Sequence, residues 1–338
     1  MALIALTAGP ARGAMASSLL MAAATVATSF VAVAAPAAAP AREVMLWVDG
    51  NNLPGESEAD WDIFMVNFTR YMRPAITSVA VCPYTVTDSG EFGYQDAKVP
   101  LCHGPDQAGE QQELHGIPRF RKLGLKQFPL LAGCPGTNIV MGMVTNRTKR
   151  TAFISKAVET MVQQGFQGYN VDFELFGSPS DVRPYQSFLA DFSAALQAKN
   201  GSLTIDIDHC CKGHNDTGYA CNGPGNAGYL GMSCADYEQF SGPDAVIYTL
   251  HTYVHDLKEL LRTVNNSAPQ IGRRYGVGVE AGLSIPNLRA ALADISAIKD
   301  GTGRAAINHL GVWWNPPLHE GPSEEYMAAV GEWLRRAI

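Results

Sequence analysis

The sequence predicts an α/β protein, specifically a (β/α)8 TIM barrel that forms a single domain after an N-terminal signal segment. From residue 44 onward, short apolar runs alternate with longer segments in which apolar residues recur at helical spacing. Repeated strand–helix units imply a parallel sheet. About eight such units in roughly 295 residues fit a closed barrel. A doubly wound sheet is disfavoured because no Gly-rich phosphate turn follows the first strand.

The individual elements follow from the same two periodicities. The expected strands cover residues 44–48, 78–86, 166–176, 203–208, 245–253, 275–280 and 309–314. The third strand is either 128–132 or 139–143. The expected helices cover residues 60–76, 152–164, 181–199, 256–265, 284–299 and 324–336. A polar loop over 87–116 is too long for a simple connection, and such loops often carry function.

Residues 1–41 predict a targeting segment rather than part of the folded domain. Arg12 precedes an Ala-rich apolar stretch over 17–35, and Ala39-Pro40-Ala41 offers a small-x-small cleavage site. Cleavage near Ala41 would leave a domain of residues 42–338. An uncleaved signal anchor is the alternative, because the apolar run is near the minimum length for a span. We therefore expect a monomeric protein that is secreted or delivered to a lysosome- or vacuole-like lumen, with no membrane segment after cleavage.

Composition narrows the partners. At 46% hydrophobic and 17% charged, the chain can bury a sizeable core. Its formal net charge is −7, and no cluster of Lys or Arg is present. Nucleic acids and anionic membranes are therefore disfavoured as partners, and an uncharged substrate fits better.

Cysteines and glycosylation sequons agree with a secretory route. An oxidising compartment would let six of the seven cysteines pair, and the lack of any CxxC motif makes a zinc site the weaker alternative. Four of the cysteines fall in one loop-like region rich in Gly and Asn. The cysteines are Cys82, Cys102, Cys134, Cys210, Cys211, Cys221 and Cys234, and the Asn-x-Ser/Thr sequons begin at Asn67, Asn146, Asn200, Asn215 and Asn265.

The strand expected over 166–176 carries polar side chains where both faces of a barrel strand should be apolar. Side chains alternate along a strand, so Asn170, Asp172 and Glu174 point the same way. Buried carboxylates are costly unless they are bonded or used. The row ends at the carboxyl edge of the strand, where barrel active sites lie. A hydrogen-bonded network inside the barrel is the structural alternative.

These residues also resemble a known motif. Residues 167–174, Gln-Gly-Tyr-Asn-Val-Asp-Phe-Glu, resemble the DGxDxDxE signature on the fourth barrel strand of family 18 glycoside hydrolases. The last two acids are kept as Asp172 and Glu174, whereas Gln167 and Asn170 replace the first two. Asn at the second of these positions is similar to the di-N-acetylchitobiase branch of the family.

The resemblance extends to two further strands. Leu-His-Thr-Tyr at 250–253 resembles the family's strand six, which makes Tyr253 the expected contact to the substrate's acetamido group, with Val254 in place of the family's Asp. Residues 310–315 resemble strand eight, where a Trp forms the floor of the sugar pocket. Trp314 is the first choice for that role, and Trp313 is the other possibility.

The resemblance implies a substrate-assisted mechanism on N-acetylglucosamine oligosaccharides, in chitin or in the chitobiose core of N-glycans. Glu174 would act as the general acid, Asp172 would orient the acetamido N–H and keep Glu174 protonated, Asn170 would hydrogen-bond Asp172, and Tyr253 would hold the acetamido oxygen. No metal or cofactor is implied.

Residues at other strand ends are ambiguous. Tyr84 and Glu280 end strands on the expected catalytic edge and are further candidates for substrate contact. A metal-site interpretation of Asp206, Asp208, His209 and His214 is weak, because their spacing matches no ligand pattern. A non-catalytic lectin on the same barrel is the alternative function, and the presence of Glu174 favours the enzyme.

Overall fold

In the computed structural model, the described residues belong to one of two units of the chain, which divides between Ala39 and Pro40. The expected targeting segment lies outside them. The structure describes residues 42–48, 53–54, 57–81, 84–94, 109–133, 136–173, 175, 179–207, 232, 234–249, 257–271, 274–280, 283–299, 306–314 and 323–336.

The second unit is built on a curled sheet of eleven strands, in the order β4-β3-β6-β7-β8-β9-β10-β11-β1-β2-β5. All pairs are parallel except the β3–β4 hairpin. The strands are β1 (Glu43–Val48), β2 (Ser78–Val81), β3 (Tyr84–Val86), β4 (Phe92–Tyr94), β5 (Lys126–Gln127), β6 (Leu130–Ala132), β7 (Gly168–Asp172), β8 (Ser202–Ile207), β9 (Val246–Thr249), β10 (Tyr275–Glu280) and β11 (His309–Trp314).

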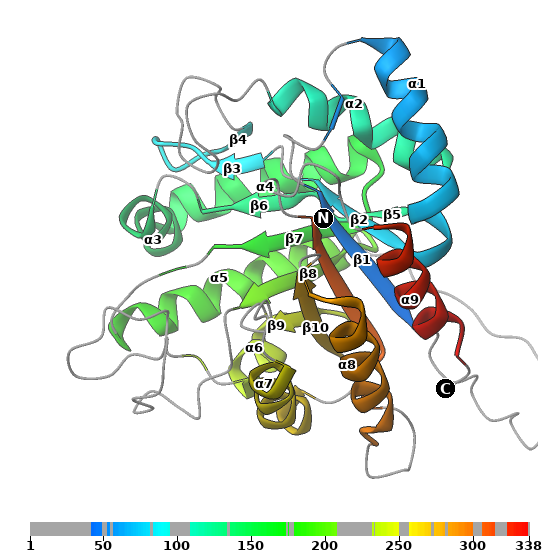
Figure 1. The fold of residues 1–338 in the computed structure, drawn as a ribbon. Coiled ribbons are helices and arrows are strands. Elements are labelled where there is room, and N and C mark those ends of the chain that lie inside the picture. The colour runs from blue at the N-terminus through cyan, green and yellow to red at the C-terminus, as the bar shows by residue number, and fades with distance from the viewer. Residues whose placement is uncertain are drawn as a thin grey trace, which may run out of the picture. The chain divides into compact units, whose positions relative to one another are not determined.

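Helices lie around the outside of this sheet (Figure 1). The first helix continues through a π-helical turn (Phe68–Met72) into a 3-10 turn (Arg73–Ala75). The α-helices are α1 (Glu58–Asn67), α2 (Gly109–Lys122), α3 (Thr137–Thr145), α4 (Arg147–Gln164), α5 (Pro179–Gln197), α6 (Cys234–Phe240), α7 (Leu257–Ile271), α8 (Ile285–Ala297) and α9 (Glu324–Arg335). Within the described part of the chain, none of these helices has the length and apolar character needed to cross a membrane.

The approach to β7 shows how local sequence sets the path of the chain. Asn146 caps the start of α4, where its side chain accepts hydrogen bonds from two backbone N–H groups. Gly165 ends the helix in the left-handed conformation, with φ 69°. Gly168 then begins β7 so close to the backbone of Ser202 on β8 that a Cβ would overlap it. A capped helix, a glycine stop and a glycine contact thus deliver β7 to its place in the sheet.

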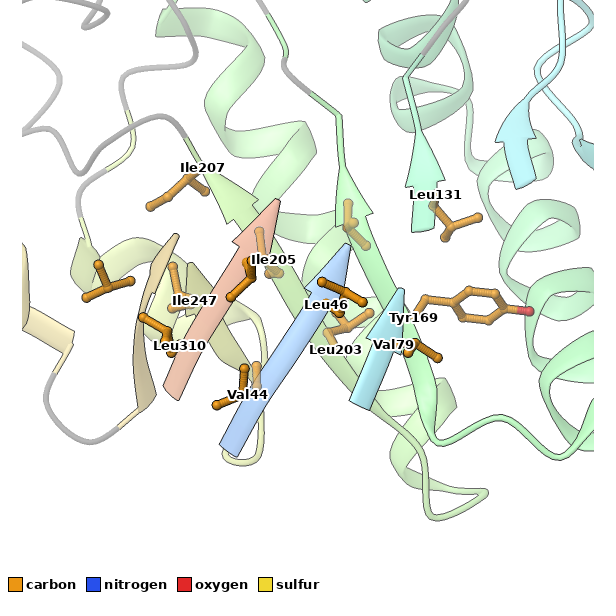
Figure 2. Close-up of a cluster of buried hydrophobic side chains, with 14 of the residues drawn as sticks. Val44, Leu46, Val79, Leu131, Tyr169, Leu203, Ile205, Ile207, Ile247 and Leu310 are labelled. Carbon is orange, nitrogen blue, oxygen red and sulfur yellow. The ribbon is translucent and has the colours of Figure 1, made fainter. Parts of the chain in front are cut away.

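The two faces of the sheet carry different side chains. The helix-covered face carries most of the hydrophobic core, including the ten labelled residues of Figure 2: Val44, Leu46, Val79, Leu131, Tyr169, Leu203, Ile205, Ile207, Ile247 and Leu310. The hydroxyl of Tyr169 donates to the carbonyl of Ala157 on α4 at 2.8 Å, which ties β7 to its helix. The inner face holds a smaller cluster formed by Met45, Trp47, Ala80, Phe128, Leu130, Ala132 and Tyr248.

The order of elements confirms the expected alternation over most of the domain. The expected strands 275–280 and 309–314 match β10 and β11 residue for residue. The third strand is formed by β5 and β6, the first of the two alternatives, whereas residues 139–143 lie inside α3.

Besides α3, three further described elements were not expected. The prediction of a loop over 87–116 was wrong in part, because β4 forms a hairpin with β3 and α2 begins at Gly109. The short helix α6 follows the cysteine-rich region. The polar composition of α2, with charged and amide side chains through most of its length, conceals its helical period.

Candidate functional site

Strand β7 places its polar residues on the inner face of the sheet. Asn170 is paired with Leu130, and Asp172 with Ala132, both members of the inner cluster. Tyr169, which precedes Asn170, and Val171, which lies between Asn170 and Asp172, belong to the helix-covered core. Asn170 is fully buried, whereas Asp172 is partly exposed at the carboxyl end of the strand. The alternation expected from the sequence is therefore confirmed over 168–172.

Asn170 is held by three side chains from other strands. Its Oδ1 accepts the indole N–H of Trp47 at 3.1 Å, and its Nδ2 donates to Thr204 Oγ1 and Asp206 Oδ1, both at 2.9 Å. An indole N–H can only donate, so this bond fixes which way the amide faces. Both Nδ2 hydrogens are used by the two β8 residues.

The expected hydrogen bond from Asn170 to Asp172 is therefore replaced by bonds to neighbouring strands. A fully buried amide in this network cannot touch a bound sugar. Asn170 can therefore position other groups, and its own side chain is closed off from solvent.

Thr204 and Asp206 enter the site although the sequence did not single them out for this role. They are buried at 3% and 7% exposure and lie on the inner face of β8, because the intervening Leu203, Ile205 and Ile207 belong to the helix-covered core. The signal was present in the sequence as two polar residues two positions apart in a strand that is otherwise apolar. Asp206 thus belongs to a hydrogen-bonded network, whereas Asp208, His209 and His214, which were considered with it for a metal site, lie outside the described residues.

Two aromatic rings fill the space beside this network. The rings of Trp47 and Tyr248 meet edge to face, with centroids 5.1 Å apart. Glycines make room for both rings, since a Cβ at Gly311 would overlap Trp47 and a Cβ at Gly276 would overlap Tyr248. Burial raises the pKa of Tyr248 well above its usual value, and the negative charges of Glu43 and Asp206 act in the same direction. Its hydroxyl therefore stays protonated.

The structure places Trp314 away from the inner face. Its ring is 7% exposed, belongs to the helix-covered core and stacks on Phe64 of α1, with centroids 6.1 Å apart and ring planes at 10°. Its neighbour Trp313 is paired with Trp47 and packs against the inner cluster. Trp314 is therefore a core residue, and Trp313, the second possibility, is the tryptophan of β11 on the inner face.

Tyr84 is also turned toward the helices. It is completely buried and stacks on Phe92 of β4, with ring centroids 5.0 Å apart. Its register partner on β6 is Leu131, a helix-covered residue. The expectation that Tyr84 contacts substrate is wrong for this reason: residues in register on parallel strands point the same way.

The remaining site predictions fall at the margins of what the structure describes. Glu174 lies outside the described residues, between Phe173 and Leu175, which are both buried in the helix-covered core. Tyr253 also lies outside them. Glu280 ends β10 in register with Trp313, and its side chain is outside the description.

Gln167, the first departure from the family signature, keeps a supporting role. Its side-chain Oε1 accepts a hydrogen bond from the backbone N–H of Gln127 at 2.7 Å, and its backbone N–H donates to the backbone carbonyl of Gln127. These bonds join the start of β7 to β5.

The described residues hold neither a cluster of metal ligands nor a described cysteine side chain. Among the residues that the structure covers, no three His, Cys, Asp or Glu side chains gather as a metal site would require. The side chains of all seven cysteines lie outside the described set, as does Asn215. The sequon residues Asn67, Asn146, Asn200 and Asn265 are exposed.

Comparison with known proteins gives a fold. No protein-family model and no curated protein matches the sequence. A chitinase from Chromobacterium violaceum superposes with a TM-score of 0.61 at 11% identity, over 88% of this chain and all of its own. A class V chitinase from Pseudomonas fluorescens gives 0.57 at 14% identity, over 87% of this chain and all of its own. The spore cortex-lytic enzyme SleL of Bacillus megaterium gives 0.56 at 12% identity, over 87% of this chain and 74% of its own. The described unit therefore shares its fold with these enzymes.

Proposed function

We propose that this protein is a glycoside hydrolase that cleaves β-1,4 linkages of N-acetylglucosamine in chitin-like oligosaccharides or in the chitobiose core of N-glycans, with Glu174 as the general acid. The observation that carries the proposal is the position of Asp172. It is partly exposed on the inner face at the carboxyl end of β7, two residues before Glu174, within a fold shared with chitinases. Catalytic groups of barrel enzymes come from this end of the strands.

The proposed chemistry needs one protein acid. Glu174 protonates the glycosidic oxygen while the substrate's acetamido carbonyl oxygen attacks the anomeric carbon, which breaks the glycosidic bond and forms an oxazolinium ion. Glu174, now a carboxylate, takes a proton from the water that opens this ion. The β configuration is thereby retained.

In this mechanism, Asp172 and Tyr253 assist the reaction. Asp172 accepts a hydrogen bond from the acetamido N–H and offsets the positive charge of the ion, while its own charge favours the protonated form of Glu174 before reaction. Tyr253 holds the acetamido oxygen in position for attack.

The same proposal includes a closed (β/α)8 barrel. β2 pairs with β5, and β6 pairs with β7. Only Phe128 and Pro129 separate β5 from β6, and the N–H of Phe128 donates to the carbonyl of Val79 on β2. Taking β2 with β3, and β5 with β6, as single interrupted strands gives eight strand positions whose last member, β11, pairs with β1.

We further propose that Trp313 supplies the aromatic floor for the sugar and that Glu280 contacts substrate beside it. Trp313 is partly exposed on the inner face, and sugar rings pack well on indole faces. Glu280 is its register partner on β10.

Residues 1–41 are proposed as a cleaved signal peptide for secretion or delivery to a lysosome- or vacuole-like lumen. The environment of Arg42 supports a domain that begins there. Arg42 is 6% exposed, donates to the Trp333 carbonyl and to Ser296 Oγ, and lies over the Trp333 ring. These contacts join the expected mature N-terminus to α8 and α9.

Activity on a chromogenic chitobioside tests the proposal. The expected result is release of the chromophore by residues 42–338, and a matched glucosamine substrate without the N-acetyl group should be inert, because the internal nucleophile is absent. Binding of chitotriose without any cleavage would instead identify a lectin and overturn the proposed activity.

A further inference from the structure

Two aspartates follow each other in register on the neighbouring strands β7 and β8. The register pairs Asn170 with Thr204 and Val171 with Ile205, so the next residues along the two strands are Asp172 and Asp206. Both lie on the inner face, and adjacent parallel strands are about 4.8 Å apart. Like charges this close disfavour simultaneous ionisation of both carboxyls.

Of the two, Asp206 is the fixed partner. It is 7% exposed and accepts the Asn170 Nδ2–H at 2.9 Å, while Trp47 holds the other end of that amide. A carboxylate can only accept, and this N–H donates to it, so the contact favours the ionised form of Asp206. Asp172 lies opposite it, at the partly exposed end of β7.

We propose that Asp206 is a positioning residue for the reaction, which supplies from β8 the buried negative charge beside Asp172 that an amide at position 170 does not provide. This inference rests on the proposed function. The fixed charge of Asp206 repels the Asp172 carboxylate, turns it toward the open end of the strand where Glu174 follows, and makes it harder to ionise.

The other titratable groups that the structure describes around Asp206 leave this pairing in place. Tyr248 is its register partner on β9, and burial keeps that phenol neutral. Glu43 acts on Tyr248 from the start of β1. Glu280 ends β10, one strand beyond Tyr248. The variable charge next to Asp206 on β7 is therefore that of Asp172.

The variant Asp206→Asn separates charge from shape. An amide oxygen at position 206 can still accept from Asn170, so the network keeps its form and loses only a charge. The acid-side midpoint of the kcat/KM profile, where Asp172 takes up a proton, is expected to fall by about one pH unit or more. The matched control is Thr204→Val, which removes the other Nδ2 acceptor without altering charge and should leave that midpoint unchanged.

An exchange of the two side chains provides a rescue. Asn170→Asp alone places two carboxylates at hydrogen-bond distance and should lower kcat and the melting temperature. Combined with Asp206→Asn, it restores one carboxylate and one amide beside Asp172, so the pH profile should return toward that of the wild type. If Asp206 had a purely structural role, the double variant would regain the melting temperature of the wild type, but the acid-side midpoint would not depend on the charge at position 206.

Carboxyl-carbon NMR titration of Asp172, assigned with Asp172→Asn, decides the inference without activity. A lower titration midpoint in Asp206→Asn than in the wild type supports it, and an unchanged midpoint overturns it. If the wild type hydrolyses no chitobioside, the proposed function fails while the titration still reports on the pair. If hydrolysis depends on Glu174 and the midpoint does not move, only the role of Asp206 fails.

Discussion

The indole N–H of Trp47 on β1 donates to the amide oxygen of Asn170 on β7, at 3.1 Å across the inside of the curled sheet. This bond links two strands that are not neighbours in the sheet. It orients the Asn170 amide toward β8 and so sets the polar network beneath Asp172. Trp47 is therefore expected to affect both stability and activity.

Trp47→Phe removes the donor and leaves a buried amide oxygen unsatisfied. Beyond the loss of ring volume, we expect a loss of about 1–3 kcal/mol in the free energy of unfolding, together with lower kcat. Trp61→Phe is the matched control, because Trp61 is equally buried but its indole N–H has no hydrogen-bond partner among the described residues. Urea unfolding of both variants measures the difference. Equal losses in the two variants would show that the hydrogen bond between Trp47 and Asn170 does not contribute to stability.

The glycine at 311 is predicted to be irreplaceable because its missing Cβ makes room for Trp47. Gly311→Ala should cost about 1–3 kcal/mol by overpacking and should displace the indole from Asn170. Gly142→Ala provides the contrast, since a Cβ there meets no atom within 4 Å and the residue lies inside α3. That variant should gain about 0.5–1 kcal/mol from helix propensity. Thermal unfolding of the pair checks both signs.

Substitutions of the two tryptophans of β11 should have different effects, one on stability and the other on substrate binding. Trp314→Ala empties a core position stacked on Phe64, so a loss of about 3–5 kcal/mol is expected. Trp313→Ala should cost less stability but raise KM for chito-oligosaccharides several-fold, because an inner-face platform for the sugar is lost. Denaturation and kinetics on both variants decide. A raised KM for a stably folded Trp314→Ala, with Trp313→Ala unaffected, would reverse the assignment.

His309, at the start of β11, predicts a loss of stability in acid. Burial lowers its pKa to about 4, Glu43 opposes this and Lys126 adds to it. The folded-state pKa therefore lies below the unfolded value of about 6.5, so the unfolded chain binds the proton more readily. Stability is fully present above about pH 6.5 and declines as the pH falls toward 4, by about 1–3 kcal/mol because the ring is only partly buried.

Urea unfolding at about pH 7 and about pH 4.5 tests this on the wild type and His309→Gln. The variant should lose less stability between the two pH values. An identical loss in both proteins would assign the acid sensitivity to other groups.

Alternation along single strands could be predicted from the sequence, whereas relationships between strands could not. The inner position of Asn170 and Asp172 followed from the period of two. The same period could not choose between Trp313 and Trp314, because the choice depends on the register of β11 against β1. Tyr84 was misplaced for the same reason, since β6 decides its face.

Hydrogen-bond partners were the least predictable feature. Thr204 and Asp206 lie more than thirty residues from Asn170 in sequence, and only the parallel pairing of β7 with β8 brings them together. The bond was expected within β7 because Asp172 was the nearest acceptor along the chain. In a parallel sheet, however, the in-register neighbours on the next strand are closer than the second residue along the same strand.

Glu174→Gln tests the central claim most directly. This substitution keeps the shape of the side chain and removes the proton donor, so turnover of a chromogenic chitobioside should fall by about 10²–10⁴-fold with chitotriose binding preserved. Glu159→Gln on the exposed face of α4 is the matched control and should turn over like the wild type. Undiminished turnover by a correctly folded Glu174→Gln variant would contradict the assignment of Glu174 as the catalytic acid.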